Sequence, residues 1–323
     1  MNSKQFFRKY GILVVLVLLI LFFSAMTSSF LSVQNLFNIL RQVSITGIVA
    51  VGMTYVLLTG GLDLSVGSLL AVTGVTASML IVKQNVNPWV AMLAAILFTT
   101  LLGVVTGLII QKIDLPPMIA TLGMMTIVRG LSFIITGGLP VYGLPAAFAM
   151  IGQGYVWVIP IPVIIMVIVF IVGAFVLNKT YFGRYFYAMG GNQEAARLAG
   201  VNVNRIKVAT YTINAFLCGI AGIILMFRIN SGQPTAATGM EMDVITATVL
   251  GGVSLSGGEG RITGVLVGCI IMGVLSNGLI IMNVGEYYQM VVKGLVLVLA
   301  VSFDKISQRN TMKNVSMKTV KAV

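Results

Sequence analysis

Residues 43–82 read VSITGIVAVGMTYVLLTGGLDLSVGSLLAVTGVTASMLIV, two apolar runs separated by one short polar break. Roughly 20 apolar residues are enough for a helix to cross the hydrocarbon core of a bilayer. A carboxylate such as Asp63 is costly between two such runs and calls for a structural or functional reason. The segment therefore predicts two membrane helices joined by a reversal at Gly60 and Gly61, with Asp63 or Ser65 capping the second helix. An open alternative is that this break lines a path through the membrane, where water can satisfy its backbone.

Long apolar runs of this kind recur along the whole chain. Of its 323 residues, 58% are hydrophobic and 9% are charged, and the mean hydropathy is +1.03, whereas a soluble domain carries about a quarter charged residues. The composition excludes a soluble fold and predicts an all-α polytopic membrane protein of about ten transmembrane helices. The ten predicted spans are residues 11–29, 43–59, 62–82, 89–111, 118–136, 157–177, 208–227, 243–256, 262–282 and 288–303. The eighth is short and rich in glycine, so we expect a broken or re-entrant element there.

The lysine and arginine residues predict how the spans are oriented, because cytoplasmic loops carry an excess of both. With the N-terminus in the cytoplasm, 15 of the 20 Lys and Arg residues fall in cytoplasmic segments, and the C-terminus is cytoplasmic too. We expect one membrane domain over residues 1–304 and a mobile basic tail over 305–323, in the inner membrane of a bacterium. The net charge of +12 is then an orientation signal. Nucleic acid is not an expected partner, because the cations punctuate apolar runs instead of sharing one face.

The chain lacks the residues and motifs on which several kinds of protein chemistry usually depend. There is no histidine, which removes the commonest proton shuttle and metal ligand. No Gly-x-x-x-x-Gly-Lys-Ser/Thr motif occurs, so any ATP that drives the protein is expected on another chain. Cys218 and Cys269 each lie in an apolar run and are expected to pack in the core. An intramembrane enzyme would have only the sparse acids Asp63, Glu241 and Asp243 to work with, so we predict neither a catalytic site nor a metal.

The longest predicted cytoplasmic loop covers residues 179–207 and contains GGNQEAARLAG at 190–200. Its segment Glu194–Leu198 predicts a short helix that is too polar to enter the membrane. A short helix with glycines on both sides has a shape that fits a groove on a partner protein. The spacing alone favours an ordinary amphipathic surface turn.

Polar residues inside the predicted spans are candidates for contact with a neutral solute, which needs hydrogen-bonding groups along an apolar passage. Each of them can equally well join neighbouring helices. The candidates are Thr54, Asp63, Ser65, Asn214, Asn277 and Gln289.

Charged residues within or beside the spans receive separate interpretations. Arg129 and Lys293 lie inside spans, where long side chains reach the interface or pair with backbone carbonyls. Glu241 and Asp243 lie at the expected outer end of the eighth span, where they stay hydrated and could dock a binding protein or meet the solute.

A short pattern suggests internal duplication. The pattern GGxxLS at residues 60–65 recurs at residues 251–256, each time at a predicted break between helices. Many transporters are built from such repeats.

Five motifs together closely resemble the ribose-type sugar permeases of ATP-binding-cassette importers, and the match runs in order from about Asn35 to Asp304. The motifs are TGGLDLSVGS at 59–68, GGNQEAARLAG at 190–200, SGQPT at 231–235, VLGGVSLSGG at 249–258 and YYQMVVKG at 287–294. The resemblance implies the type II importer fold, a homodimer, a binding protein outside the cytoplasm that delivers the sugar, and a separate ATPase that holds ATP and Mg²⁺. It also implies that the loop couples to this ATPase through Gly191, Asn192, Glu194, Ala195, Arg197 and Gly200. Open alternatives are a permease for branched-chain amino acids or nucleosides and an ion-coupled secondary transporter.

Overall fold

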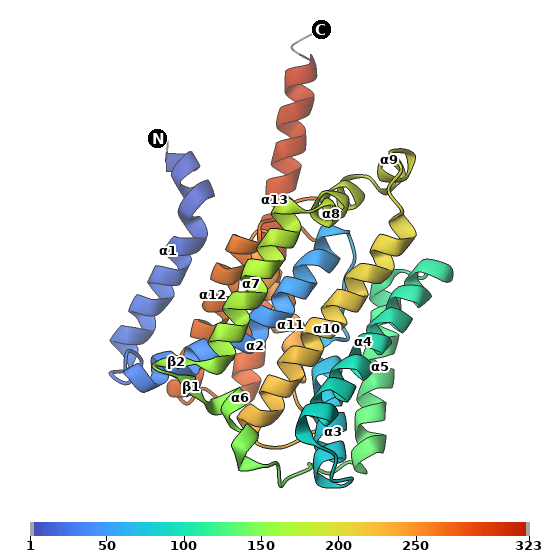
Figure 1. Cartoon of the computed structure of the whole chain (residues 1–323). Helices are drawn as coiled ribbons and strands as arrows, with labels where there is room; N and C mark the ends of the chain where they lie inside the picture. The colour runs from blue at the N-terminus through green and yellow to red at the C-terminus, as the bar shows by residue number, and fades with distance from the viewer. Residues whose placement is uncertain (1–2, 321–323) are drawn as a thin grey trace.

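The protein is a bundle of helices (Figure 1). The computed structural model describes the backbone of residues 3–320 and the side chains of residues 11–302 and 305. The longer helices are α1 (Ser3–Met26), α2 (Val33–Leu58), α3 (Val66–Val82), α4 (Pro88–Lys112), α5 (Pro117–Thr136), α7 (Ile161–Lys179), α8 (Tyr181–Gly191), α10 (Val203–Ile229), α11 (Met240–Leu250), α12 (Ile262–Ile281) and α13 (Glu286–Val320). The short elements are η1 (Ala146–Phe148), α6 (Met150–Gln153), α9 (Gln193–Leu198) and the hairpin of β1 (Tyr155–Val156) and β2 (Ile159–Pro160).

Each of the ten predicted apolar runs overlaps one helix of the structure, which confirms the all-helical class. Within the described residues, α2, α4, α5, α7, α10 and α12 are long and apolar enough to cross a membrane. Gly11–Met26 of α1 and all of α3 are shorter apolar helices. The chain is therefore a multi-pass membrane protein.

Helices α2, α3 and α10 form the centre of the bundle. Helix α10 packs against α2, α3 and α4, and α3 lies between α4 and α5. From Val43 to Leu58 nearly every residue of α2 is buried, whereas α4 leaves Leu93, Leu97 and Leu101 exposed along one face. A helix that is apolar all round and buried belongs to the core, and an exposed apolar face on a membrane helix is covered by lipid.

The break between α2 and α3 differs from the prediction. Helix α2 ends at Leu58, Gly60 adopts a φ of 76° that suits glycine, and α3 begins at Val66 instead of Leu62. The seven residues between the two helices, 59–65, are not helical. Ser65 occupies the N-cap position, but its side chain makes no capping bond, so the expected cap by Ser65 is wrong. The hydroxyl instead donates to Asp63.

Other boundaries also move for local reasons. The sixth predicted span begins at Trp157, but β1 and β2 pair in an antiparallel hairpin and α7 starts only at Ile161. Trp157 lies in the turn with a φ of 59°. Proline at the second position of α7 suits a helix start, because the first helical amides have no partner within the helix. Helix α11 is short, as expected, and ends at Leu250 rather than at residue 256.

Helices α8 and α9 lie at the same end of the bundle as the start of α1 and the end of α13 (Figure 1). We call this the α9 end, and the other the opposite end. Helix α13 continues from the predicted membrane domain into the predicted tail, through Val320. The last three residues of that predicted tail, 321–323, lie outside the described residues.

Candidate coupling surface and buried polar site

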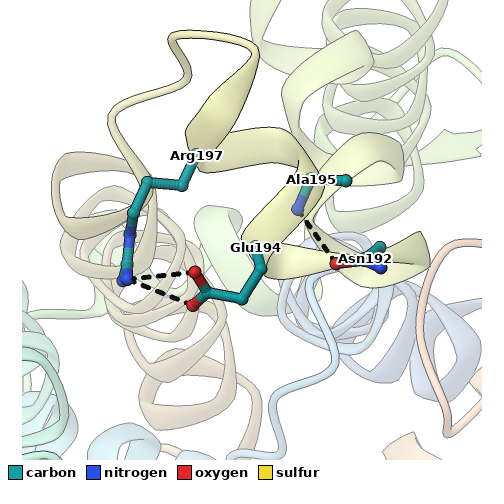
Figure 2. Close-up of polar contacts among 4 residues, drawn as sticks. All are labelled: Asn192, Glu194, Ala195 and Arg197. Atoms are coloured by element: carbon teal, nitrogen blue, oxygen red, sulfur yellow. Dashed lines mark hydrogen bonds and ion pairs between the residues drawn. The ribbon is translucent and has the colours of Figure 1, made fainter.

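Helix α9 projects polar side chains from the α9 end of the bundle (Figure 2). Asn192 is its N-cap, and the side-chain oxygen accepts a hydrogen bond of 3.0 Å from the amide of Ala195. A capping oxygen of this kind satisfies one of the amides that open a helix. Gly200, with a φ of 86°, follows the helix end. The predicted short helix is confirmed, and it begins one residue earlier, at Gln193.

The charges of α9 form an exposed pair. The Nη1 atom of Arg197 lies 3.1 Å from Oε1 of Glu194, and the two side chains are 54% and 71% exposed (Figure 2). Leu198 at the helix end is 88% exposed. Exposed ion pairs contribute little to stability. The bundle therefore does not need this pair, and the side chains are free for contact with another molecule.

Helix α8 holds α9 against the bundle, and the sequence analysis did not predict it. Its buried residues Gly183, Phe186 and Met189 recur every third position, which is the signal that could have found it. Phe186 is fully buried, with its ring centroid 5.2 Å from that of Tyr55 on α2. The exposed α9 is thus carried on a helix with a well-anchored inner face.

A buried polar site lies at the break between α2 and α3. Asp63 is 1% exposed. Its Oδ1 atom accepts hydrogen bonds from the amide of Ser65 at 2.9 Å and from the Ser65 hydroxyl at 2.6 Å, and its Oδ2 atom accepts one from Asn214 Nδ2 at 2.8 Å. Gly52 of α2 packs directly against Asn214, where a β-carbon would overlap the amide oxygen. The structure thus brings together three of the six predicted path residues.

The other three candidates lie apart from Asp63. The Thr54 hydroxyl donates to the carbonyl of Ala50 in its own helix. Asn277 exchanges two hydrogen bonds of 2.9 Å with Asn35, which joins α12 to α2. Gln289 donates to the carbonyl of Val284. Asn35 was missed because it precedes the second predicted span.

Two ionic contacts order the opposite end of the bundle. Arg129 donates from Nη1 to the carbonyls of Pro234 and Ala236 at 2.7 and 2.8 Å, which confirms the expected pairing with backbone. Lys293 instead binds Asp243, with 2.6 Å between Nζ and Oδ2 and side chains 25% and 21% exposed. The expectation for Lys293 named an interface or backbone carbonyls as its partners and did not include Asp243.

Glu241 is also half-buried, close to Gly67 of α3. Sequence reasoning missed the ion pair of Asp243 because 50 residues separate the two partners.

The part of the chain that the structure describes contains no group of three or more Cys, Asp or Glu residues placed to hold a metal ion. Cys218 and Cys269 are buried and free.

Apolar helices surround a buried polar break, and an exposed polar helix lies at one end of the bundle, an arrangement that suits a membrane permease. The chain belongs to the family described as branched-chain amino acid transport system / permease component, whose model matches residues 35–301. The predicted resemblance to ribose-type permeases is confirmed by the similarity of individual relatives.

Three relatives illustrate this similarity. The chain is 47% identical over 310 residues to the ribose import permease protein RbsC of Escherichia coli (strain K12), covering 95% of this chain and 96% of the relative. It is 45% identical over 300 residues to RbsC of Bacillus subtilis (strain 168), with 92% and 93% covered. It is 40% identical over 301 residues to the L-arabinose transport system permease protein AraH of Escherichia coli (strain K12), with 93% and 92% covered. No solved structure shows a significant match.

Proposed function

We propose that this chain is the membrane-spanning permease subunit of an ATP-binding-cassette importer for a monosaccharide, a ribose-like pentose or a hexose. The observation that carries the proposal is identity of 40% or more, over more than nine-tenths of the chain, to permeases named for ribose and arabinose import. A binding protein outside the cytoplasm delivers the sugar, a separate ATPase subunit holds ATP and Mg²⁺, and two copies of this chain form the passage.

The proposed topology has ten membrane crossings with both termini in the cytoplasm. It is supported by the ten helices found in the ten apolar runs and by the excess of Lys and Arg in the segments assigned to the cytoplasm. The α9 end then faces the cytoplasm, since α9 lies beside the start of α1 and the end of α13. Each GGxxLS pattern follows the end of a helix, α2 at Leu58 or α11 at Leu250, and precedes the next helix, α3 or α12, in keeping with an internal duplication.

The proposed ATPase contact is the surface formed by Gly191, Asn192, Glu194, Ala195, Arg197 and Gly200. Support comes from the exposure of the Glu194 and Arg197 side chains, which the bundle does not use. The Asn192 cap orders the start of the helix that carries both charges. A rigid helix with a charged face suits insertion into a groove on a partner.

The solute is proposed to pass near the break at Asp63 and Ser65. The hydrogen bond that Asp63 accepts from Asn214 ties the break to α10, so passage requires these helices to move apart. ATP binding and hydrolysis on the partner would shift the equilibrium between states open to the two sides.

A branched-chain amino acid is the second candidate, because the matching family model is described by that substrate. A zwitterion would need partners for both charges, and Asp63 is the buried acid in the middle of the chain's polar break. A nucleoside is neutral, so only competition between a nucleoside and labelled ribose for uptake distinguishes it from a monosaccharide.

An ion-coupled secondary transporter would retain uptake without ATP.

The test uses the substitution Glu194→Lys in the complex with its ATPase. We expect the reversed charge to abolish association with the ATPase and uptake of labelled ribose, while insertion into the membrane stays intact. The control is Glu286→Lys, which makes the same charge change on an exposed acid at the start of α13 and should retain the ATPase. Normal association and uptake by Glu194→Lys would defeat the coupling assignment.

A further inference from the structure

Glycines from three distant parts of the chain meet at the α9 end of the bundle. Gly60 follows α2, Gly190 lies near the end of α8, and Gly257 with Gly258 belongs to the loop between α11 and α12. A β-carbon placed on Gly257 would lie 2.9 Å from the Cα of Gly190 and 2.9 Å from the amide nitrogen of Gly60. We call these four residues the glycine joint.

Position 190 requires glycine because of close contact with its neighbours, and not because of an unusual backbone conformation. Its backbone is helical, unlike Gly257 and Gly258, whose φ angles are 83° and 74°. A β-carbon on Gly190 would overlap the carbonyl oxygen of Leu58 and the amide nitrogen of Gly258. Main chain packs directly on main chain here, so α8 has no flexible side chain between itself and its two neighbours.

Directional bonds hold the joint together. The amide of Gly258 donates to the carbonyl of Leu58 at 2.9 Å, which ties the α11–α12 loop to the end of α2. The Tyr187 hydroxyl on α8 donates to the carbonyl of Gly260 at 2.9 Å. Burial raises the pKa of Tyr187 above its ordinary value, although Arg261 opposes the shift, so the hydroxyl remains protonated and able to donate.

The joint lies between the exposed surface of α9 and the buried polar site. Asn192 separates α8 from α9, so a force on α9 acts on α8 within two residues of Gly190. On the other side, Gly60 leads through a short nonhelical segment to Asp63, which binds Asn214 of α10. Close-packed contacts of this kind move as units and deform little.

We propose that Gly190 and Tyr187 are positioning residues that transmit movement of α9 at once to the α2–α3 break and to the α11–α12 loop. This inference rests on the proposed function and adds a second receiving element, the α11–α12 loop, to the coupling path. Because the contact has no side chains, inserting a single methyl group separates α8 from both neighbours while the surface of α9 stays unchanged.

The main test compares Gly190→Ala with Gly123→Ala in complexes with the ATPase subunit. Gly123 is also a helical glycine, in α5, but a β-carbon there meets nothing within 4 Å. We expect Gly190→Ala to assemble with the ATPase, and stimulation of ATP hydrolysis by the sugar-loaded binding protein to fall roughly tenfold, within the usual range of coupling between sites. Uptake of labelled ribose per ATP hydrolysed should fall in parallel. Normal stimulation and uptake by an assembled Gly190→Ala complex would overturn the proposal.

A second pair decides the matter if Gly190→Ala does not assemble. Tyr187→Phe removes only the hydroxyl that donates to Gly260, and Tyr185→Phe removes a hydroxyl from an exposed position on the same helix. We expect Tyr187→Phe to assemble and lower the ratio of sugar moved to ATP hydrolysed severalfold, with Tyr185→Phe unchanged. An unchanged ratio in Tyr187→Phe would contradict the proposal that the glycine joint transmits movement of α9. Loss of ATP-dependent ribose uptake in the unmodified complex would instead refute the proposed function, so the two failures are distinguishable.

Discussion

Asp63 and Glu194 are two of only eight acidic residues in the chain, and their surroundings differ completely. Asp63 is buried and accepts three hydrogen bonds from Ser65 and Asn214. The Glu194 side chain is 71% exposed and forms an ion pair with Arg197, one helical turn away. Where lipid surrounds the bundle, polar groups must find partners inside the protein. At the α9 end, charges are left available to a partner protein.

The largest expected effect is on the buried side of this comparison. Asp63→Ala leaves the Asn214 amide and the Ser65 hydroxyl without their shared acceptor, and each unpaired buried group costs about 1–3 kcal/mol. We expect the thermal unfolding midpoint of the purified protein to fall clearly. Glu194→Ala is the matched control and should leave the midpoint unchanged. Equal midpoints for the two variants would show that the bundle does not depend on the Asp63 contacts.

The half-buried ion pair of Lys293 and Asp243 is expected to contribute less to stability than the Asp63 contacts and more than the exposed Glu194. A double-mutant cycle with Lys293→Met and Asp243→Asn measures the pair directly. Contacting residues typically couple by 0.5–3 kcal/mol, and we expect a value of about 1 kcal/mol, because the pair is partly screened by solvent. The measurement is again thermal unfolding.

The same cycle separates two roles of Asp243. If pairing is its role, the double variant should regain the stability lost in the more harmful single variant and should keep uptake. If both single variants and the double variant lose uptake at normal stability, Asp243 acts in docking or in contact with the solute instead.

The smallest effect on the bundle is expected at the cap of α9. Asn192→Ala removes the oxygen that accepts from Ala195, a change that costs about 0.5–2 kcal/mol of helix stability. Because α9 is short and lies outside the bundle, we expect faster amide hydrogen exchange in Gln193–Leu198 with no change in the unfolding midpoint. Affinity for the ATPase should fall severalfold. Asn192→Ser, which keeps a capping oxygen, should restore slow exchange, and equally fast exchange in both variants would rule out the cap as the cause.

The sequence alone located the long helices well, because membrane helices require unbroken apolar runs of known length. It also located α9, whose polar composition is incompatible with the membrane. Boundaries set by local contacts were less predictable. The start of α3 depends on the hydrogen bond that Asp63 accepts from the Ser65 hydroxyl. The start of α7 depends on the β1–β2 hairpin before it.

The candidate sites were predictable only in part, for a related reason. Asp63, Ser65 and Asn214 were each identified as polar residues inside spans, but their convergence depends on how α10 crosses the break. The glycine joint of Gly60, Gly190, Gly257 and Gly258 has no apolar periodicity and no charge, so only the glycines themselves mark it in the sequence. The pairing of Lys293 with Asp243 likewise joins helices far apart in the sequence.

The central claim is that this chain forms the passage while a separate subunit supplies the energy. The most direct measurement is labelled ribose uptake and ATP hydrolysis in proteoliposomes that contain the chain alone or with its ATPase, in the presence of the binding protein. We predict accumulation only when the ATPase and ATP are both present, and no hydrolysis by the chain alone. Accumulation without the ATPase, or nucleotide hydrolysis by the purified chain, would contradict the account.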